Sequence, residues 1–248
     1  MREIFADELK KLQGRFMEMG LNVSEQIYQS TKSFIDHDKQ LAQLVVDADK
    51  ETNHEEMDLE ERALKLIALQ QPVATDFRVI ISILKASSDL ERMGDHAVTI
   101  ARETIRVKGN PRVAEIEDDI AQITALVRRM LENALDAYVS KDEQAARKVA
   151  KIDLDIDQHY ILTRDRVTAT MRQDPQTITA SSAYMNVIRL LERIGDHIVN
   201  LTEWIVYSTS GQIVELNPGK SDPELLQGLL NDTESQRMLS HDATPKQK

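Results

Sequence analysis

The sequence predicts an all-α protein, built as a tandem repeat of two three-helix bundles with six long helices and a pseudo-two-fold relation between the halves. Three observations support this prediction. The 248 residues include only 8 glycines and 6 prolines, and aromatic residues make up 4%, a composition typical of long helices. Apolar residues recur at steps of three and four over long stretches. Finally, LERMGDH at Leu90–His96 returns as LERIGDH at Leu191–His197, with six of seven letters identical, which indicates an internal repeat.

The first half, residues 1–108, contains three predicted helices, over residues 3–36, 38–69 and 76–107. The second helix is expected to end at QQPVATD, because Pro72 cannot continue a helical hydrogen-bond ladder. Thr75 or Asp76 is expected to cap the third helix. The first helix shows the helical spacing most clearly, at Ile4, Leu9, Leu12, Phe16, Met19, Val23, Ile27, Ser30 and Phe34.

The linker KGNP at 108–111 separates this half from the second, residues 109–208, in which the same plan is expected. Helices are predicted over residues 113–139 and 142–171. RQDPQTITASS then forms the turn into a last helix that ends near residue 207. The remaining residues, 209–248, are expected to form a flexible tail, with one short helix predicted in SDPELLQGLL.

Composition and charge exclude several classes of protein. The formal net charge is −11 and no basic stripe is present, which argues against a nucleic-acid partner. The chain has no cysteine, so disulfides, thiolate metal sites and cysteine nucleophiles are excluded. The lack of cysteine also suits a cytosolic protein. No apolar run reaches the roughly 20 residues of a membrane span, so at most peripheral membrane association is expected. Phosphate-binding loops and the common hydrolase motifs are absent.

The repeated motif places two acids four residues apart, Glu91 and Asp95 in the first half and Glu192 and Asp196 in the second. Residues at this spacing are neighbours on one face of a helix. That face lies away from the apolar stripe, so each pair is expected to face solvent or a partner. Two diverged halves have both retained these acids, and core packing alone does not require surface acids.

The preceding helix of each half has a matching pair at the same spacing, Asp49 and Asn53, then Asp153 and Asp157. If the second and third helices of a half pack antiparallel, the two pairs converge. Oxygen donors grouped in this way suit hard cations, and carboxylates also bind manganese and non-haem iron. The alternative is that these acids are ordinary solvated helix faces, as many acidic pairs are in an acidic chain.

In the first half, Glu56 and Glu60 extend the upstream stripe, whereas the aligned positions of the second half are Tyr160 and Arg164. Only the first upstream pair therefore recurs.

Other repeated residues have structural interpretations. Gly94 and Gly195 lie inside helices, where glycine costs about 1 kcal/mol relative to alanine, so something is expected to approach them closely: a neighbouring helix, an ion shell or a partner. His96 and His197 are interpreted as structural rather than as metal ligands, because the glutamate and the histidine are five positions apart instead of three. The arginines Arg92 and Arg193 are expected to pair with acids or with a partner.

At these residues the sequence resembles the PhoU family of phosphate-uptake regulators, over roughly residues 3–208. The resemblance depends on the duplicated E-x-x-x-D motif, on the upstream acidic pairs, and on LQQPVATDFR at 69–78, which is similar to an interhelical signature of that family. Two departures are visible: Asn53 replaces a carboxylate, and the second half has RQDPQTITASS in place of the signature. The two sites are therefore expected to differ.

The resemblance implies two similar three-helix bundles that bind metal at the acidic motifs, with iron, in some members multinuclear, expected first and manganese, zinc or magnesium as alternatives. It implies a cytoplasmic negative regulator of phosphate uptake. Such a regulator would link the ATPase subunit of a phosphate ABC transporter to the sensor histidine kinase of the phosphate response, and would form homodimers.

The leading functional hypothesis is a non-enzymatic adaptor with metal at the duplicated motif. A carboxylate-bridged metalloenzyme or metal-storage protein is the first alternative, and it would require buried ligands with an open coordination position. A helical scaffold whose acids only provide solubility is the second.

Overall fold

A computed structural model describes residues 2–217 and residue 228, and within residues 2–217 all regular secondary structure is helical. The first half consists of α1 (Arg2–Ile35), α2 (Lys39–Asp47), α3 (Asp49–Gln70) and α4 (Ala74–Arg106). The second half consists of α5 (Ala114–Ser140), α6 (Glu143–Ala150), α7 (Asp153–Gln173), a 3-10 turn η1 (Pro175–Thr177) and α8 (Ile178–Ser210). The two halves thus repeat one order of elements, which confirms the predicted fold class.

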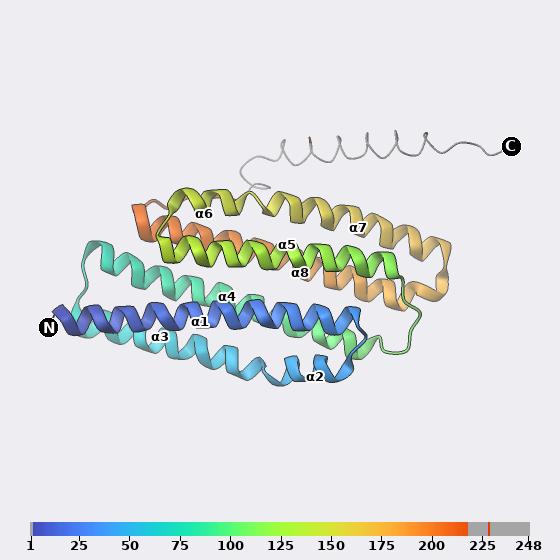
Figure 1. The fold of residues 1–248 in the computed structure, drawn as a ribbon, viewed down its shortest axis with the longest axis horizontal. Coiled ribbons are helices and arrows are strands. Elements are labelled where there is room, and N and C mark those ends of the chain that lie inside the picture. The colour runs from blue at the N-terminus through green and yellow to red at the C-terminus, as the bar shows by residue number, and fades with distance from the viewer. Residues whose placement is uncertain (1, 218–227, 229–248) are drawn as a thin grey trace.

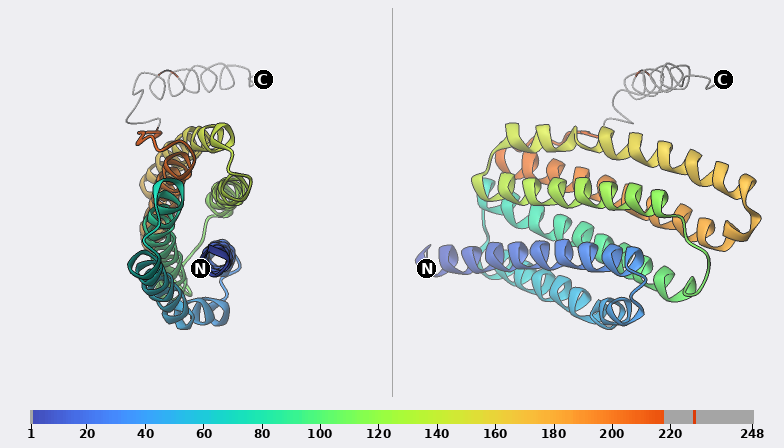
Figure 2. Two further views of the ribbon diagram at one scale, coloured as in Figure 1. Left: turned by 90° about the vertical axis from the view of Figure 1, so that its left-hand side faces the viewer. Right: turned by 45° about the vertical axis from the view of Figure 1, so that its right-hand side comes forward.

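The helices form two layers (Figure 1). One layer contains α3, α4, α8 and α7 in that order, and the other contains α1 and α5, as the end-on view of Figure 2 shows. The two bundles contact each other through α4 against α8 and α1 against α5. The two helices that contain the repeated motif are therefore packed side by side in the middle of the molecule. None of the helices described is long and apolar enough to cross a bilayer.

The predicted second helix of each half is broken in the structure, and this corrects the ranges 38–69 and 142–171. The first break lies at Ala48, which joins α2 to α3, and the second lies at Lys151 and Ile152, which join α6 to α7. At both breaks the backbone hydrogen bonds tighten from the fourth to the third preceding residue, as from Glu51 N–H to the Ala48 carbonyl at 2.9 Å. Neither break contains glycine or proline, so no local signal predicts it. Each break comes just before an aspartate of an upstream pair.

The turn between α3 and α4 also differs from the prediction. Helix α4 begins at Ala74, two residues early, and Val73 occupies the N-cap position without a side-chain cap. Thr75 instead accepts a hydrogen bond from the Arg78 guanidinium, one turn into the helix. Asp76 lies in the first turn, where a negative charge is favourable beside the helix dipole.

The apolar stripes of the motif helices are fully buried, as the sequence predicts. The stripe residues of both repeats have at most 1% of their surface exposed: Leu90, Met93, Ala97, Ile100, Leu191, Ile194, Ile198 and Leu201. They belong to one hydrophobic core that extends through both bundles. This packing fixes the rotation of α4 and α8 about their axes, and with it the direction of the acids on the motif.

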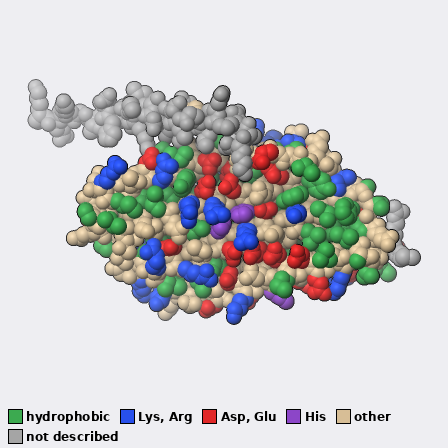
Figure 3. Space-filling view, turned by 180° about the vertical axis from the view of Figure 1, so that it is seen from behind, with side chains coloured by type: hydrophobic (Ala, Val, Ile, Leu, Met, Phe, Trp, Pro, Cys, Tyr) green, Lys and Arg blue, Asp and Glu red, His purple; other side chains and the backbone are tan. Residues whose placement is uncertain are grey.

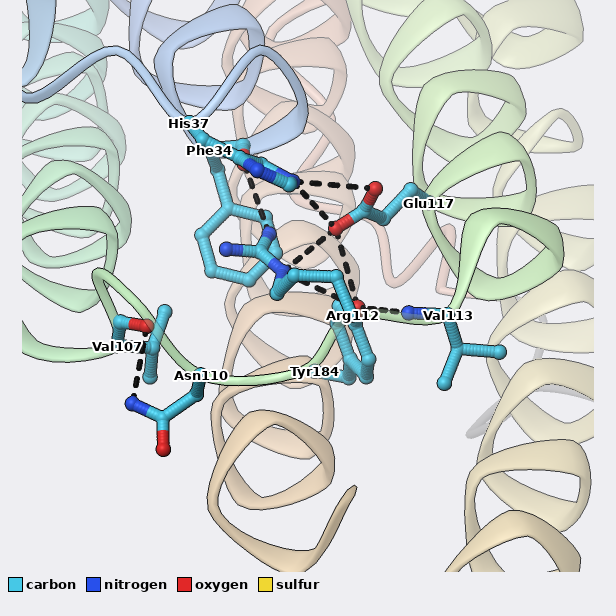
Figure 4. Close-up of polar contacts among 8 residues, drawn as sticks. All are labelled: Phe34, His37, Val107, Asn110, Arg112, Val113, Glu117 and Tyr184. Atoms are coloured by element: carbon cyan, nitrogen blue, oxygen red, sulfur yellow. Dashed lines mark hydrogen bonds and ion pairs between the residues drawn. The ribbon is translucent and has the colours of Figure 1, made fainter. Parts of the chain in front are cut away.

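A buried polar cluster joins the two bundles at the linker (Figure 4). The Arg112 guanidinium donates to Glu117 Oε1 at 2.6 Å and to the carbonyl of Phe34 at 2.8 Å, and its carbon lies 4.4 Å from the centre of the Phe34 ring. Tyr184 donates to the same Glu117 oxygen at 3.0 Å and accepts from the backbone N–H of Val113 at 2.9 Å. The cluster connects the end of α1, the linker, α5 and α8. It therefore sets how the bundles are aligned.

The expected tail from residue 209 is partly ordered in the structure. Residues 209–210 complete α8, and residues 211–217 return along that helix with defined contacts. The short helix expected at 221–230 lies outside the described residues except for residue 228, which is helical.

Candidate functional site

The acidic motifs lie in two seams of the four-helix layer. Glu91 and Asp95 on α4 face the seam with α3, and Glu192 and Asp196 on α8 face the seam with α7. Figure 3 shows this face: acidic side chains gather in two groups, with histidine, arginine and lysine side chains between them.

The first acidic cluster comprises Asp49, Glu56, Glu91 and Asp95. Glu91 is half-buried, and burial followed by the charges of Asp95, Glu56 and Asp49 raises its pKa. Burial also raises the pKa of Glu56, with a contribution from Asp95. Arg92 lies 3.6 Å from both Glu91 and Asp95, as expected for an arginine that pairs with the motif acids. The upstream helix and the motif helix therefore converge as the spacing predicts.

The second acidic cluster comprises Asp153, Asp157, Glu192 and Asp196. Burial, with the charges of Asp196 and Asp157, raises the pKa of Glu192 to about 7. Burial and the charge of Asp196 raise the pKa of Asp157 to about 6. Burial among like charges thus favours the protonated form of these two carboxyls more than solvent would.

The acids are less exposed than the helical pattern predicts. Asp153 has only 2% of its surface exposed, and Asp157, Glu192 and Asp196 are half-buried, so the second pair does not face open solvent. The reason is the packing of α7 against α8 within the second half, which places these acids in the seam between the two helices. Asn53 is half-buried on α3, and it does not contribute to the raised pKa of Glu91.

The two motif glycines are explained by the neighbouring helix, which was one of the expected causes. A Cβ on Gly94 would lie 3.1 Å from Thr52 Cγ2 on α3 and 3.2 Å from Gln26 Oε1 on α1. A Cβ on Gly195 would lie 2.6 Å from Asp153 Oδ1, closer than atoms can approach. Glycine thus allows the upstream helix to bring its acid next to the motif.

The two motif histidines meet between α4 and α8, with ring centres 5.5 Å apart. Because they occupy equivalent positions of the repeat, the pseudo-two-fold axis passes between them. His197 Nδ1 is hydrogen-bonded to Asp89 at 2.9 Å, and Asn200 donates to the same oxygen at 3.0 Å. Burial, with the nearby His197 and Arg193, lowers the pKa of His96 to about 4, so this ring is neutral. These contacts support the structural interpretation of both histidines.

The donor set of the two clusters suits a hard cation. Every side chain in them offers carboxylate oxygen, the ligand type that hard cations prefer. Within the described residues, no three histidine or acidic side chains are already grouped as ligands of one ion.

Two contributors to this face were missed from the sequence. Asp89 directly precedes the repeated heptapeptide, but its equivalent in the second half is Leu190, so the repeat carried no signal. Asn217, which donates to Asp196 Oδ1 at 2.7 Å, follows the repeat in a segment without a motif. Only the return of the chain along α8 brings it to the site.

The fold and the site define a class of protein: a helical double bundle that presents a duplicated acidic motif on one broad face. A family model described as PhoU domain matches the chain twice, over residues 16–104 and 120–205. The chain belongs to the PhoU family.

Curated relatives and solved structures agree with this assignment. A Streptococcus pneumoniae protein named "Phosphate-specific transport system accessory protein PhoU homolog" is 34% identical over 217 residues, which cover 88% of this chain and 100% of the relative. A Pseudomonas aeruginosa protein of the same name is 33% identical, with 84% and 86% covered.

The crystal structure of the phosphate transport system regulatory protein PhoU from S. pneumoniae matches with a TM-score of 0.80 at 32% identity, covering 86% of this chain and 100% of that one. PhoU from P. aeruginosa matches with a TM-score of 0.79 at 34% identity, covering 84% of this chain and 100% of the other.

Proposed function

We propose that this protein is a cytoplasmic negative regulator of phosphate uptake, and that it acts as an adaptor rather than as an enzyme. The observation that carries the proposal is the pair of acidic clusters on one face of a chain whose relatives are named as phosphate transport accessory and regulatory proteins. Two equivalent sites on a broad face suit contacts with other proteins better than they suit one enclosed reaction centre.

The partners in this proposal are the ATPase subunit of a phosphate ABC transporter and the sensor histidine kinase of the phosphate response. The acidic clusters supply the attraction for cations and for basic protein surfaces, since charge complementarity steers such encounters. A homodimer would present four clusters and would let one regulator contact more than one partner.

Metal is the second part of the proposal. Iron is the first expectation, with manganese, zinc or magnesium as alternatives. Glu91, Asp95, Glu192 and Asp196 would hold it together with Asp49, Asp153 and Asp157, and Asn53 is the weakest candidate because it carries no charge. A bound cation would offset the mutual repulsion of these half-buried carboxylates. It would also change the surface that a partner meets.

The test compares three full-length proteins. The site variant replaces Glu91, Asp95, Glu192 and Asp196 by alanine. The control variant removes the same charge from the opposite layer by replacing Glu3, Glu25, Glu115 and Asp136, which are exposed on α1 and α5. Elemental analysis, pull-down with the transporter ATPase and the kinase, and expression of a phosphate-regulated reporter are measured for each protein.

We expect metal content, partner capture and repression to be lost in the site variant and kept in the control. Loss of metal with intact capture would restrict the clusters to metal binding. Unchanged results for all three measurements would contradict the proposed role of these residues. Turnover of an oxidase or hydrolase substrate by the iron- or manganese-loaded protein would favour the metalloenzyme alternative instead.

A further inference from the structure

The chain reverses direction at the end of α8. Gly211 has φ of +79°, the left-handed conformation that glycine adopts at helix C-termini, and its N–H bonds to the Tyr207 carbonyl at 2.9 Å. The side chain of Arg78 on α4 lies 3.4 Å from the position that a Cβ on Gly211 would take. A larger residue would therefore meet both backbone strain and a neighbouring side chain. Residues 211–217 then run back along α8, and we call them the C-terminal strap.

The C-terminal strap is anchored to α8 at two residues that lie about two turns apart. The N–H of Leu216 donates to Glu203 Oε1 at 2.7 Å, and the side-chain amide of Asn217 donates to Asp196 Oδ1 at 2.7 Å. Val214 and Leu216 pack against the hydrophobic core. Both polar anchors are charge-assisted hydrogen bonds, which are stronger than bonds between neutral groups.

Burial shows that the end of the strap packs against the second acidic cluster instead of lying in solvent. Asn217 has 8% of its surface exposed, although it is an amide on a segment that follows the last helix of the repeat. Ile213, in contrast, is 86% exposed and takes no part in the anchoring. The polar end of the strap is thus its most buried residue, and it is buried against a motif carboxylate.

The first acidic cluster has a different cover. Its motif aspartate, Asp95, is the repeat equivalent of Asp196, and its side chain is 41% exposed. After α4 the chain passes through Val107 and Arg112 into α5, away from the seam between α3 and α4. The exposed Arg92 is the ionic partner of Asp95, at 3.6 Å. The motif aspartate of the second copy is therefore held by a hydrogen bond from the strap, whereas the motif aspartate of the first copy has only an exposed arginine beside it.

We propose that the C-terminal strap closes the second acidic cluster, so that a divalent cation reaches the first cluster directly and the second only after Asn217 releases Asp196. This inference takes from the proposed function only the assumption that the clusters bind cations. It assigns Asn217 as the residue that restricts access to the second copy of the motif. It also assigns the strap a part in controlling access to the site.

Carboxylate labelling tests closure without any metal. Full-length protein is treated with a carbodiimide and an amine at pH 6, and mass spectrometry follows the labelling of Asp95 and Asp196. The test variant is Asn217→Asp, which is nearly isosteric and places a like charge against Asp196. Asn217→Ala removes the amide without adding charge. Ile213→Ser is the matched control on the same strap.

We expect Asp95 to be labelled at least threefold faster than Asp196 in the unmodified protein. Both Asn217 variants should raise the labelling of Asp196 toward that of Asp95, and Ile213→Ser should leave it unchanged. Equal labelling of the two aspartates at the start, or an Asn217→Asp variant that labels like the unmodified protein, would overturn the proposal. Thermal melts of each variant identify general unfolding, which would raise labelling at both aspartates.

Manganese binding then separates this inference from the proposed function. Spin-resonance titration with Mn²⁺ alone should show one readily filled cluster in the unmodified protein and two in Asn217→Asp. Exposure of Asp196 in the labelling experiment without any Mn²⁺ binding would support closure by the strap and contradict cation binding. Two equal Mn²⁺ sites in the unmodified protein would contradict closure and support cation binding.

Discussion

Replacing Gly195 by alanine tests the argument that the upstream helix brings its acid against the motif. In an open helix interior this substitution is stabilising, because alanine is favoured by about 1 kcal/mol. At Gly195 the new Cβ would lie 2.6 Å from Asp153 Oδ1 and 3.3 Å from Ile156 Cδ1. Asp153 is almost fully buried, so its carboxylate has little room to move. Overpacking of this kind costs about 1–3 kcal/mol, which leaves a net loss of about 1 kcal/mol.

Gly14 provides the matched control. It lies inside α1 with no atom within 4 Å of the position of its Cβ, so Gly14→Ala should gain the full helix preference of about 1 kcal/mol. The two variants should differ by about 2 kcal/mol, or about 4–8 °C in melting temperature for a chain of this size. The stability of Gly94→Ala should lie between those of the other two variants. Its new Cβ would lie 3.1 Å from Thr52 Cγ2 and 3.2 Å from Gln26 Oε1, so these side chains need to move only slightly.

The assay is thermal unfolding followed by far-ultraviolet circular dichroism at pH 7, supported by urea titration. The expected order of stability is Gly14→Ala, then Gly94→Ala, then Gly195→Ala. A Gly195→Ala variant as stable as Gly14→Ala would refute the close approach of Asp153. The glycine would then need another explanation, such as a partner that packs against α8.

Three further predictions concern buried charge. Arg112→Met should destabilise the protein by about 3 kcal/mol, because it removes the guanidinium that pairs with the nearly buried Glu117 carboxylate. The double variant with Glu117→Gln should recover part of this stability in urea titration. No recovery would mean that the loss has another origin. Asp89→Ala should cost about 1–2 kcal/mol by removing the acceptor shared by His197 and Asn200, and an unchanged melting temperature would contradict that role. Glu192→Gln should stabilise the protein by about 1–2 kcal/mol at pH 8, a value reduced for the partial exposure of the side chain. The reason is that a carboxyl pKa raised to about 7 makes ionised Glu192 less stable in the folded protein than in the unfolded chain. The unmodified protein loses stability as pH rises from about 4.5 to 7, because Glu192 ionises in the unfolded chain before it ionises in the folded protein. The stability gained by Glu192→Gln should therefore shrink toward pH 4.5. A gain that does not change with pH would contradict the raised pKa.

Much of the site follows from local sequence. The apolar stripe and the i, i+4 acids of α4 and α8 depend only on helical geometry, and an amphipathic pattern over 30 residues specifies that geometry well. The convergence of Asp49 with Glu91 followed from one further step, antiparallel packing of neighbouring helices. The helix breaks at Ala48 and Lys151 could not be predicted from the sequence. At each break the backbone N–H bonds to the carbonyl of the third preceding residue instead of the fourth, and this change requires no special residue type.

The degree of burial of the acids depended on packing between helices, which the spacing along one helix does not fix. Packing of α7 against α8 buries Glu192, and this burial raises its pKa to about 7. Packing of α8 against α4 joins His96 to His197, which lie far apart in the chain.

The sequence by itself determined the helical class, the duplication, the positions of the acids on their helices and the resemblance to the PhoU family. These properties depend on residue type and on short-range spacing, which a single chain displays directly. Only the tertiary structure decided how the two motif aspartates differ in their partners: Asp95 pairs with the exposed Arg92, whereas Asp196 is bound by Asn217. That difference arises because the chain turns at Gly211 and returns along α8. The periodicity of a single segment does not predict contacts between that segment and a distant part of the chain.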